Sequence, residues 1–165
     1  MSGTESDTLR DTVSDAKNLL KTKSLCASYG DFQALFNIEF EINAGETVAV
    51  IGANGAGKST FLRALAGAMD THTEMIRFDG RPIGHLPAHD VLRLGIALVP
   101  EGRKLFQSLS VQENLQIGAD FGRPGPWNLK RVFELFPVLA ERRAQPATSM
   151  SGGQQQMCAI DRKST

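Results

Sequence analysis

The 165-residue sequence lacks both a long apolar run and a net charge. Its longest uninterrupted apolar runs, such as 48–51, contain four residues, whereas a helix needs about 20 to cross a bilayer. The 18 Lys and Arg residues balance the 18 Asp and Glu residues, so no overall charge favours a nucleic acid or an anionic membrane as a partner. The first residues are polar and contain no apolar segment of the kind found in secretory signals. These absences exclude a membrane-spanning chain and predict cytoplasmic residence without nucleic-acid binding.

Cysteine is equally scarce. Cys26 and Cys158 lie far apart in the sequence, and neither belongs to a set with zinc-ligand spacing. Structural disulfides are rare in cytoplasmic proteins, so we expect both thiols to be reduced.

At about 150 residues per domain, the length predicts one domain. The composition, 41% hydrophobic and 22% charged, is that of a globular protein.

The distribution of residue types separates a tail from a domain. Residues 1–22 are rich in Ser, Thr and Asp and are expected to form a mobile polar N-terminal tail. After the tail, short apolar runs alternate with turn residues and helix-forming segments, which is typical of an α/β fold. We expect strands at 25–29, 36–42, 47–51, 75–78 and 96–99, and helices at 59–66, 110–119, 129–136 and 151–160. The strand at 47–51 is apolar on both faces, which predicts a position in the middle of a sheet.

A glycine-rich loop follows this strand. Its sequence at 52–60, GANGAGKST, matches the pattern G-x-x-x-x-G-K-[S/T] of a phosphate-binding P-loop. The glycines allow backbone conformations in which successive amides point at phosphate oxygens, and the following helix adds its positive N-terminal end. Lys58 can reach the β- and γ-phosphates, and the Ser59 hydroxyl can bind Mg²⁺. The predicted ATP-binding residues of the loop are Gly52, Asn54, Gly55, Ala56, Gly57, Lys58, Ser59 and Thr60.

A second anion-binding motif, MSGGQ at 150–154, begins the last predicted helix. Two glycine amides and a serine hydroxyl at a helix N-terminus form an anion site. Ser151 and Gln154 also have the spacing of a capping box, as do Ser110 and Glu113 at an earlier helix start. In a chain that already carries a P-loop, this motif indicates a second contact to nucleotide phosphate.

Together, the two motifs resemble those of the ATP-binding subunits of ABC transporters. GANGAGKST resembles the Walker A motif of that family, and MSGGQ resembles its signature motif, which usually begins with Leu. The resemblance covers about 25–160 and implies a P-loop NTPase core with an antiparallel β subdomain and a helical insertion at about 106–160. We therefore expect a partial ABC ATP-binding domain at 23–165.

The resemblance also implies roles for further residues. Tyr29, in SYGDFQAL, matches the aromatic A-loop residue that stacks on adenine in this family, and a half-buried strand tyrosine is the alternative interpretation. Glu101, in VPEGRKLF, stands where the family usually has the Q-loop Gln, which links the γ-phosphate and Mg²⁺ to the helical subdomain; a plain surface acid is its alternative. The signature residues expected to contact ATP held by a second subunit are Ser151, Gly152, Gly153 and Gln154.

Substrate and partners follow from the resemblance alone. The stretches YGDFQAL, VPEGR and ERRAQPATSMSGGQQQM are similar to the ATPase subunits of branched-chain amino-acid importers, with importers of amides or urea as alternatives. The implied partners are transmembrane permease subunits and a second ATP-binding subunit, identical or different. The permease would hold the chain on the inner face of the cell membrane.

One element of the family is missing from the sequence. A Walker B strand, in which apolar residues precede Asp and Glu, normally follows the signature helix, but this chain departs from the family pattern at Asp161 and stops at Thr165. The C-terminal part of the core is therefore expected to be missing, and we expect Mg-ATP binding with little or no hydrolysis. The alternatives are a non-catalytic nucleotide-binding module or inert truncated fragment, and a small P-loop kinase, which would not predict MSGGQ.

Overall fold

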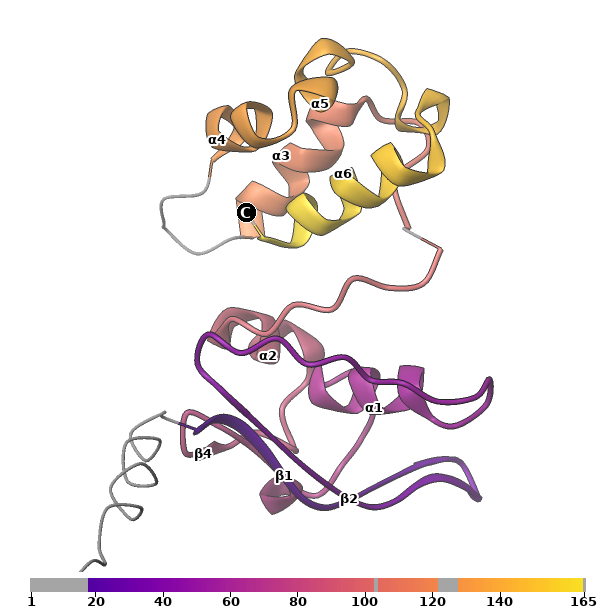
Figure 1. Ribbon diagram of the computed structural model, residues 1–165, viewed down its shortest axis with the longest axis vertical. Coiled ribbons are helices and arrows are strands. Elements are labelled where there is room, and N and C mark those ends of the chain that lie inside the picture. The colour runs from indigo at the N-terminus through magenta and orange to yellow at the C-terminus, as the bar shows by residue number, and fades with distance from the viewer. Residues whose placement is uncertain (1–17, 103, 122–127, 165) are drawn as a thin grey trace, which may run out of the picture. The chain divides into compact units, whose positions relative to one another are not determined.

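The computed structural model describes residues 18–102, 104–121 and 128–164, which form two compact units that divide between Ala88 and His89 (Figure 1). The first unit contains a four-stranded antiparallel sheet with the strand order β2-β1-β3-β4. Its strands are β1 (Asn18–Tyr29), β2 (Phe32–Asn43), β3 (Ile76–Phe78) and β4 (Arg81–Pro82). Two-residue turns join β1 to β2 and β3 to β4, and the positive φ angles of Gly30, Asp79 and Gly80 suit such tight hairpins.

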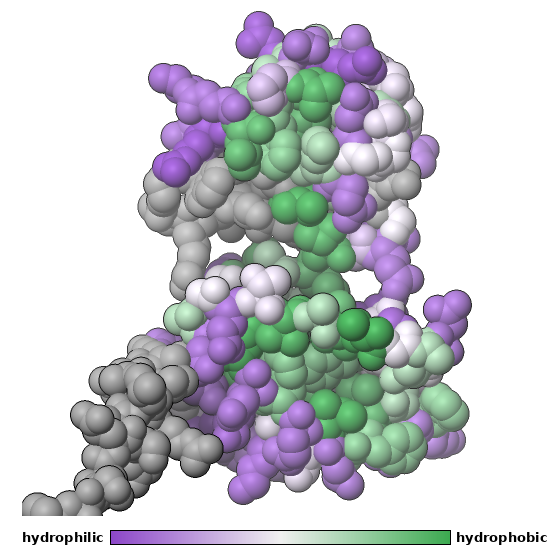
Figure 2. All heavy atoms as spheres, viewed as in Figure 1, coloured by the Kyte–Doolittle hydropathy of each residue, from purple (hydrophilic) through white to green (hydrophobic). Residues whose placement is uncertain are grey.

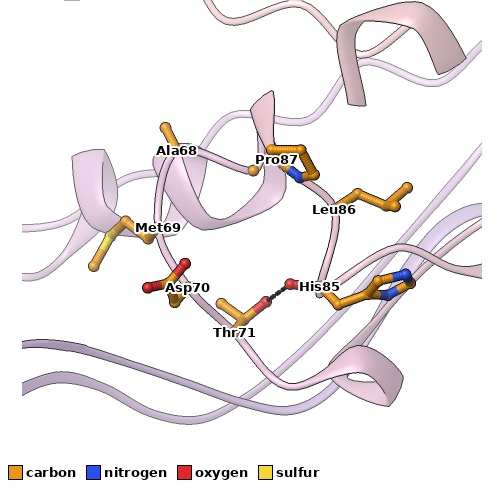
Figure 3. A pocket seen from close by; sticks show the side chains of 9 residues that line it. Ala68, Met69, Asp70, Thr71, His85, Leu86 and Pro87 are labelled. Carbon is orange, nitrogen blue, oxygen red and sulfur yellow. Dashed lines mark hydrogen bonds between the residues drawn. The ribbon is translucent and has the colours of Figure 1, made fainter. Parts of the chain in front are cut away.

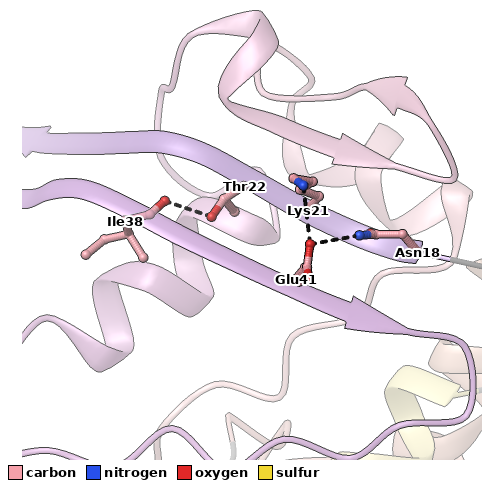
Figure 4. Close-up of polar contacts among 5 residues, drawn as sticks. All are labelled: Asn18, Lys21, Thr22, Ile38 and Glu41. Atoms are coloured by element: carbon pink, nitrogen blue, oxygen red, sulfur yellow. Dashed lines mark hydrogen bonds and ion pairs between the residues drawn. The ribbon is translucent and has the colours of Figure 1, made fainter. Parts of the chain in front are cut away.

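The first strand corrects the predicted extent of the tail. It begins at Asn18, so residues 18–22 belong to the sheet, because Leu20 and the fully buried Thr22 alternate inward along the strand. Figure 4 shows the polar contacts that join this segment to β2. Glu41 accepts hydrogen bonds from Lys21 and Asn18, each at 3.2 Å, and the Thr22 hydroxyl donates to the Ile38 carbonyl at 2.9 Å. The remainder of the predicted tail, 1–17, lies outside the described residues.

Helix α1 (Lys58–Leu65) packs on the β1–β2 hairpin and confirms the helix predicted after the P-loop. Phe61 is buried, and its ring lies edge-on to that of Phe40 with centroids 5.2 Å apart. Gly67 follows the helix with φ 66°, which confirms the predicted left-handed residue at this end. A short 3-10 helix, η1 (Thr73–Met75), then leads into β3.

Two predicted strands are wrong. Residues 47–51 and 96–99 have no regular structure, and none of the described strands pairs with either segment. A strand exists only where a neighbour supplies hydrogen bonds to its backbone, and apolar composition alone supplies none. Ile51 is 91% exposed, and Val48 and Val50 are also exposed. Figure 2 shows hydrophobic side chains gathered on the displayed face of the unit that carries β1 and β2.

The described part of the second unit is helical. Its elements are α2 (Ala88–Leu94), which starts at the boundary, α3 (Val111–Phe121), α4 (Leu129–Leu135), α5 (Pro137–Glu141), η2 (Ala147–Ser149) and α6 (Gly152–Ser164). The core of the unit consists of Val111, Leu115, Val132, Leu139, Ala147, Met150 and Cys158. None of the helices in the described ranges is both long enough and apolar enough to span a membrane.

Capping boxes confirm two predicted helix starts in this unit. The Ser110 backbone N–H donates to the Glu113 carboxylate at 2.8 Å, and the Glu113 N–H donates to the Ser110 hydroxyl at 3.2 Å. At α6, the Ser151 N–H donates to the Gln154 side chain at 3.0 Å, and the Gln154 N–H donates to the Ser151 hydroxyl at 3.4 Å. Both pairs satisfy backbone donors that a helix start leaves without an intrahelical partner.

Candidate nucleotide-binding site

The P-loop leads from the unpaired segment 47–51 into α1. Gly55 and Gly57 adopt φ angles of 84° and 86°, in the left-handed region that favours glycine. A Cβ at Gly57 would lie 3.0 Å from the Leu35 side chain and 3.3 Å from the Ala34 carbonyl. Gly57 therefore lets the loop approach β2 closely, while residues 52–56 stay exposed to solvent. The result is an exposed backbone loop braced against the hairpin.

Lys58 places its ammonium inside this loop. Its Nζ donates to the carbonyl oxygens of Gly52 at 2.8 Å and Ala53 at 2.7 Å. These two carbonyls come from the start of the loop, so the side chain folds back across it. A mobile ammonium at this position can exchange carbonyl partners for phosphate oxygens without a change in the backbone.

The start of α1 has the features of an anion site. Gly57 occupies the N-cap position and offers no side chain to cap the helix, and the first turn contains no acidic residue. The N-terminal amides and the helix dipole therefore favour a negatively charged ligand. Ser59 and Thr60 bring hydroxyl groups to this same turn. The geometry thus joins a lysine, two hydroxyls and a helix N-terminus within a few residues.

The Ser59 hydroxyl suits a magnesium ion that arrives with a nucleotide. Mg²⁺ prefers oxygen ligands and is held in nucleotide sites by one or two protein groups, phosphate oxygens and water. The described residues contain no cluster of three or more His, Cys, Asp and Glu side chains able to hold a metal. The exposed Ser59 hydroxyl is an oxygen donor of the kind that such an ion would use.

Tyr29, at the end of β1, lies beside this helix start. Its hydroxyl is 3.4 Å from the Thr60 hydroxyl, although the two residues are 31 positions apart. The hydrogen bond with Thr60, together with Arg63 one turn further along α1, lowers the pKa of the Tyr29 hydroxyl below its ordinary value. The structure therefore brings the predicted A-loop residue to the P-loop helix.

Arg63 is a part of this arrangement that the sequence analysis missed. It lies three positions after Thr60 on α1, and residues at that spacing share a helix face. The spacing of Thr60 and Arg63 was the available signal. It indicates a role for Arg63 only once the β1–β2 hairpin is known to pack against this face of α1. The cation adds positive charge at the side of the helix that faces Tyr29.

The predicted signature residues begin α6 in the second unit. Met150 is buried and anchors the motif, whereas Ser151, Gly152 and Gly153 are exposed. A Cβ at Gly153 would meet no atom within 4 Å, so the backbone here is open to a ligand. The capping contacts of Ser151 and Gln154 fix the shape of this exposed helix start.

Glu101 also belongs to the second unit, in an exposed turn continued by Gly102 with φ 74°. The segment after this turn lies beside the one that leads to the signature motif, and the two line a cavity of about 280 Å³. The lining residues are Gly102, Lys104, Leu105, Gln107, Ala147, Thr148 and Gln155. The structure thus places the segment that follows Glu101 beside the one that precedes the signature motif, and Tyr29 beside α1.

A larger cavity of about 550 Å³ in the first unit contains none of the predicted site residues. It lies between 67–71 and 84–87, and Figure 3 shows the Thr71 hydroxyl donating across it to the Gly84 carbonyl, a bond of 2.7 Å. A Cβ at Gly84 would collide with the His72 carbonyl, so the two loops meet too closely for any side chain there. The polar side chains that line this cavity are those of Asp70, Thr71 and His85.

Comparison with known proteins identifies relatives for most of the chain. The family model described as ABC transporter matches residues 35–164. The chain is 44% identical over 146 residues to the high-affinity branched-chain amino acid transport ATP-binding protein BraG of Pseudomonas aeruginosa, covering 87% of this chain and 63% of that protein. It is 33% identical to the probable branched-chain amino acid transport ATP-binding protein LivF of Archaeoglobus fulgidus, covering 86% of this chain and 61% of that protein. The chain thus spans about three fifths of the length of these curated relatives.

Solved structures confirm the predicted P-loop NTPase fold. One, described as an ATP-binding subunit of an ABC transporter, matches with a TM-score of 0.70 and 29% identity, over 87% of this chain and 60% of that chain. Another, a nucleotide-free ATP-binding cassette, matches with a TM-score of 0.74 and 23% identity, over 88% of this chain and 64% of that chain. At 23% identity the second likeness concerns the fold alone.

Proposed function

Because the chain belongs to the ABC transporter family, we propose that it binds Mg-ATP as the ATP-binding subunit of an importer of branched-chain amino acids. The observation that carries the nucleotide part is the folding of Lys58 across the exposed P-loop, at the uncapped start of α1. The names of the two relatives support the substrate class.

Each residue of the loop has a role in this proposal. The backbone amides of Gly52, Asn54, Gly55, Ala56 and Gly57 and the first turn of α1 surround the phosphates, and Lys58 neutralises the β- and γ-phosphate charge. Bound Mg²⁺ supplies charge stabilisation to the phosphates, with Ser59 as its protein ligand and Thr60 beside it. Tyr29 contacts the adenine from the hairpin side.

The second set of residues would act on ATP held by another subunit. Ser151, Gly152, Gly153 and Gln154 form a helix start able to contact a γ-phosphate, and Glu101 would act as the Q-loop residue. ATP would then join two ATP-binding subunits head to tail. Transmembrane permease subunits would complete the transporter and hold this subunit on the inner face of the membrane.

Sedimentation of the 165-residue chain with and without Mg-ATP tests this division of labour. We expect ATP to promote dimers of the wild-type chain, Lys58→Ala to weaken nucleotide binding and dimers together, and Ser151→Ala to reduce dimers while the monomer still binds ATP. Equal loss of monomer affinity in both variants would contradict the two roles. Thermal unfolding of Ser151→Ala controls for its loss of the α6 cap.

A second candidate is nucleotide binding without turnover by these 165 residues. It is favoured by the absence from 1–165 of an apolar stretch that ends in Asp and Glu, the pair needed to hold Mg²⁺ and orient water. Phosphate release measured on the same samples decides between the two: dimers without release favour this candidate, and Lys58-dependent release at a rate normal for an ABC ATPase excludes it.

A further inference from the structure

We propose that Phe32 forms, together with Tyr29, a two-ring aromatic surface that contacts the nucleobase. This inference rests on the proposed function and deepens it, since it assigns a second base-contacting residue that no sequence motif indicated. The argument starts from the register of the β1–β2 hairpin and the exposure of its tip.

The hairpin register places the two aromatic residues side by side. Tyr29 and Phe32 flank a two-residue turn and are direct partners across it. Side chains of directly opposed residues in an antiparallel pair lie on the same face of the sheet, close enough to touch. Phe32 therefore stands next to Tyr29.

The shared face is the one that meets the P-loop helix. The Tyr29 hydroxyl is 3.4 Å from Thr60 on α1. Two residues back along β1, on the same face as Tyr29, Ala27 is paired with Leu35, and Leu35 is the side chain that a Cβ at Gly57 would approach to 3.0 Å. A register irregularity between Ala27 and Ser28 adds one residue to β2 and so keeps Leu35 and Phe32 on this face. Both pairs thus direct side chains toward the segment that is proposed to hold the phosphates.

The rings of Phe32 and Tyr29 are exposed at the hairpin tip. The Phe32 side chain is 70% exposed, and that of Tyr29 is 46% exposed. Burial of an aromatic side chain is normally favourable, so these two adjacent exposed rings offer an apolar surface that a ligand can cover. A purine offers aromatic faces that stack on such rings irrespective of hydrogen-bonding groups, and the nearby phosphate cradle favours a nucleotide over a protein as the ligand.

Calorimetry with two ligands separates base contacts from phosphate contacts. Mg-ATP carries the base, and Mg-tripolyphosphate carries the phosphates alone. We expect Phe32→Ala to weaken Mg-ATP binding about three- to tenfold and to leave Mg-tripolyphosphate binding unchanged. Phe32→Trp, which keeps an aromatic ring, should restore ATP affinity.

Phe36 provides the matched control. It lies on the same strand and is also exposed, but it follows Leu35 directly and so projects from the opposite face. Phe36→Ala should bind both ligands like the wild-type chain. An ATP affinity of Phe32→Ala equal to that of the wild-type chain would overturn the inference and leave nucleotide binding intact, whereas a wild-type chain that binds neither ligand would overturn the proposed function and this inference with it.

Discussion

At the scale of single residues, a buried amide organises the approach to α3. Asn114 is fully buried (0% exposed). Its side-chain oxygen accepts from the Phe106 N–H at 2.9 Å, and its amide nitrogen lies within hydrogen-bonding distance of the carbonyls of Phe106, Leu109 and Ser110. Buried polar groups that lose such a partner retain their desolvation cost. The Asn114 side chain therefore fixes 106–110, the segment through which the chain enters α3.

We predict that Asn114→Ala lowers the free energy of unfolding by about 2–4 kcal/mol, because it removes the hydrogen bonds between a fully buried side chain and the backbone of 106–110. Denaturant unfolding of the variant measures the loss. Gln112→Ala, on the first turn of the same helix, is the control and should change stability by less than about 0.5 kcal/mol. A loss of that small size for Asn114→Ala would refute the role of the amide.

At the scale of the element, the α3 capping box carries a charge whose effect depends on pH. Hydrogen bonds from the Ser110 hydroxyl and backbone N–H hold the pKa of the Glu113 carboxyl below its usual range. A lowered pKa means that the folded chain binds the proton less readily than the unfolded chain. The stabilisation is thus complete above the unfolded-state pKa and is lost as the pH falls through the folded-state pKa.

We predict that Glu113→Gln is less stable than the wild-type chain near neutral pH and that this difference shrinks on acidification to about pH 3. Unfolding curves at several pH values give the measurement. Glu134→Gln removes an exposed helical carboxylate outside any cap and serves as the control. A stability difference that stays constant over the whole pH range would contradict the charged capping box.

Elements were predictable where their signals are local. The capping residues at 110–113 and 151–154 specify helix starts through contacts within one turn, and Pro137 ends α4 because it cannot continue the hydrogen-bond pattern of the helix. The pairing of strands could not be predicted from such local signals. The start of β1 depends on β2 residues about 20 positions away, and the apolar segment 47–51 looks like a strand although no described strand pairs with it.

At the scale of the whole molecule, some residues of the candidate site could be identified from the sequence, and others only from the folded structure. The P-loop was identified from sequence because its chemistry requires fixed spacing, and Tyr29 from its resemblance to a family motif. Phe32 and Arg63 were missed because their relation to the site arises from hairpin register and from packing of α1. The chain forms two units, with 52–60 in the first and Ser151 in the second, so the roles in nucleotide binding and in subunit pairing can be tested separately.

The central claim is that the loop at 52–60 binds the phosphates of Mg-ATP through Lys58. Isothermal titration of Mg-ATP into the 165-residue chain and into Lys58→Ala tests it most directly, with thermal unfolding to confirm that both are folded. The account predicts one nucleotide per chain for the wild type and an affinity lower by about tenfold or more for the variant, which lacks the charged donor. Equal affinities of the two folded proteins would contradict the claim.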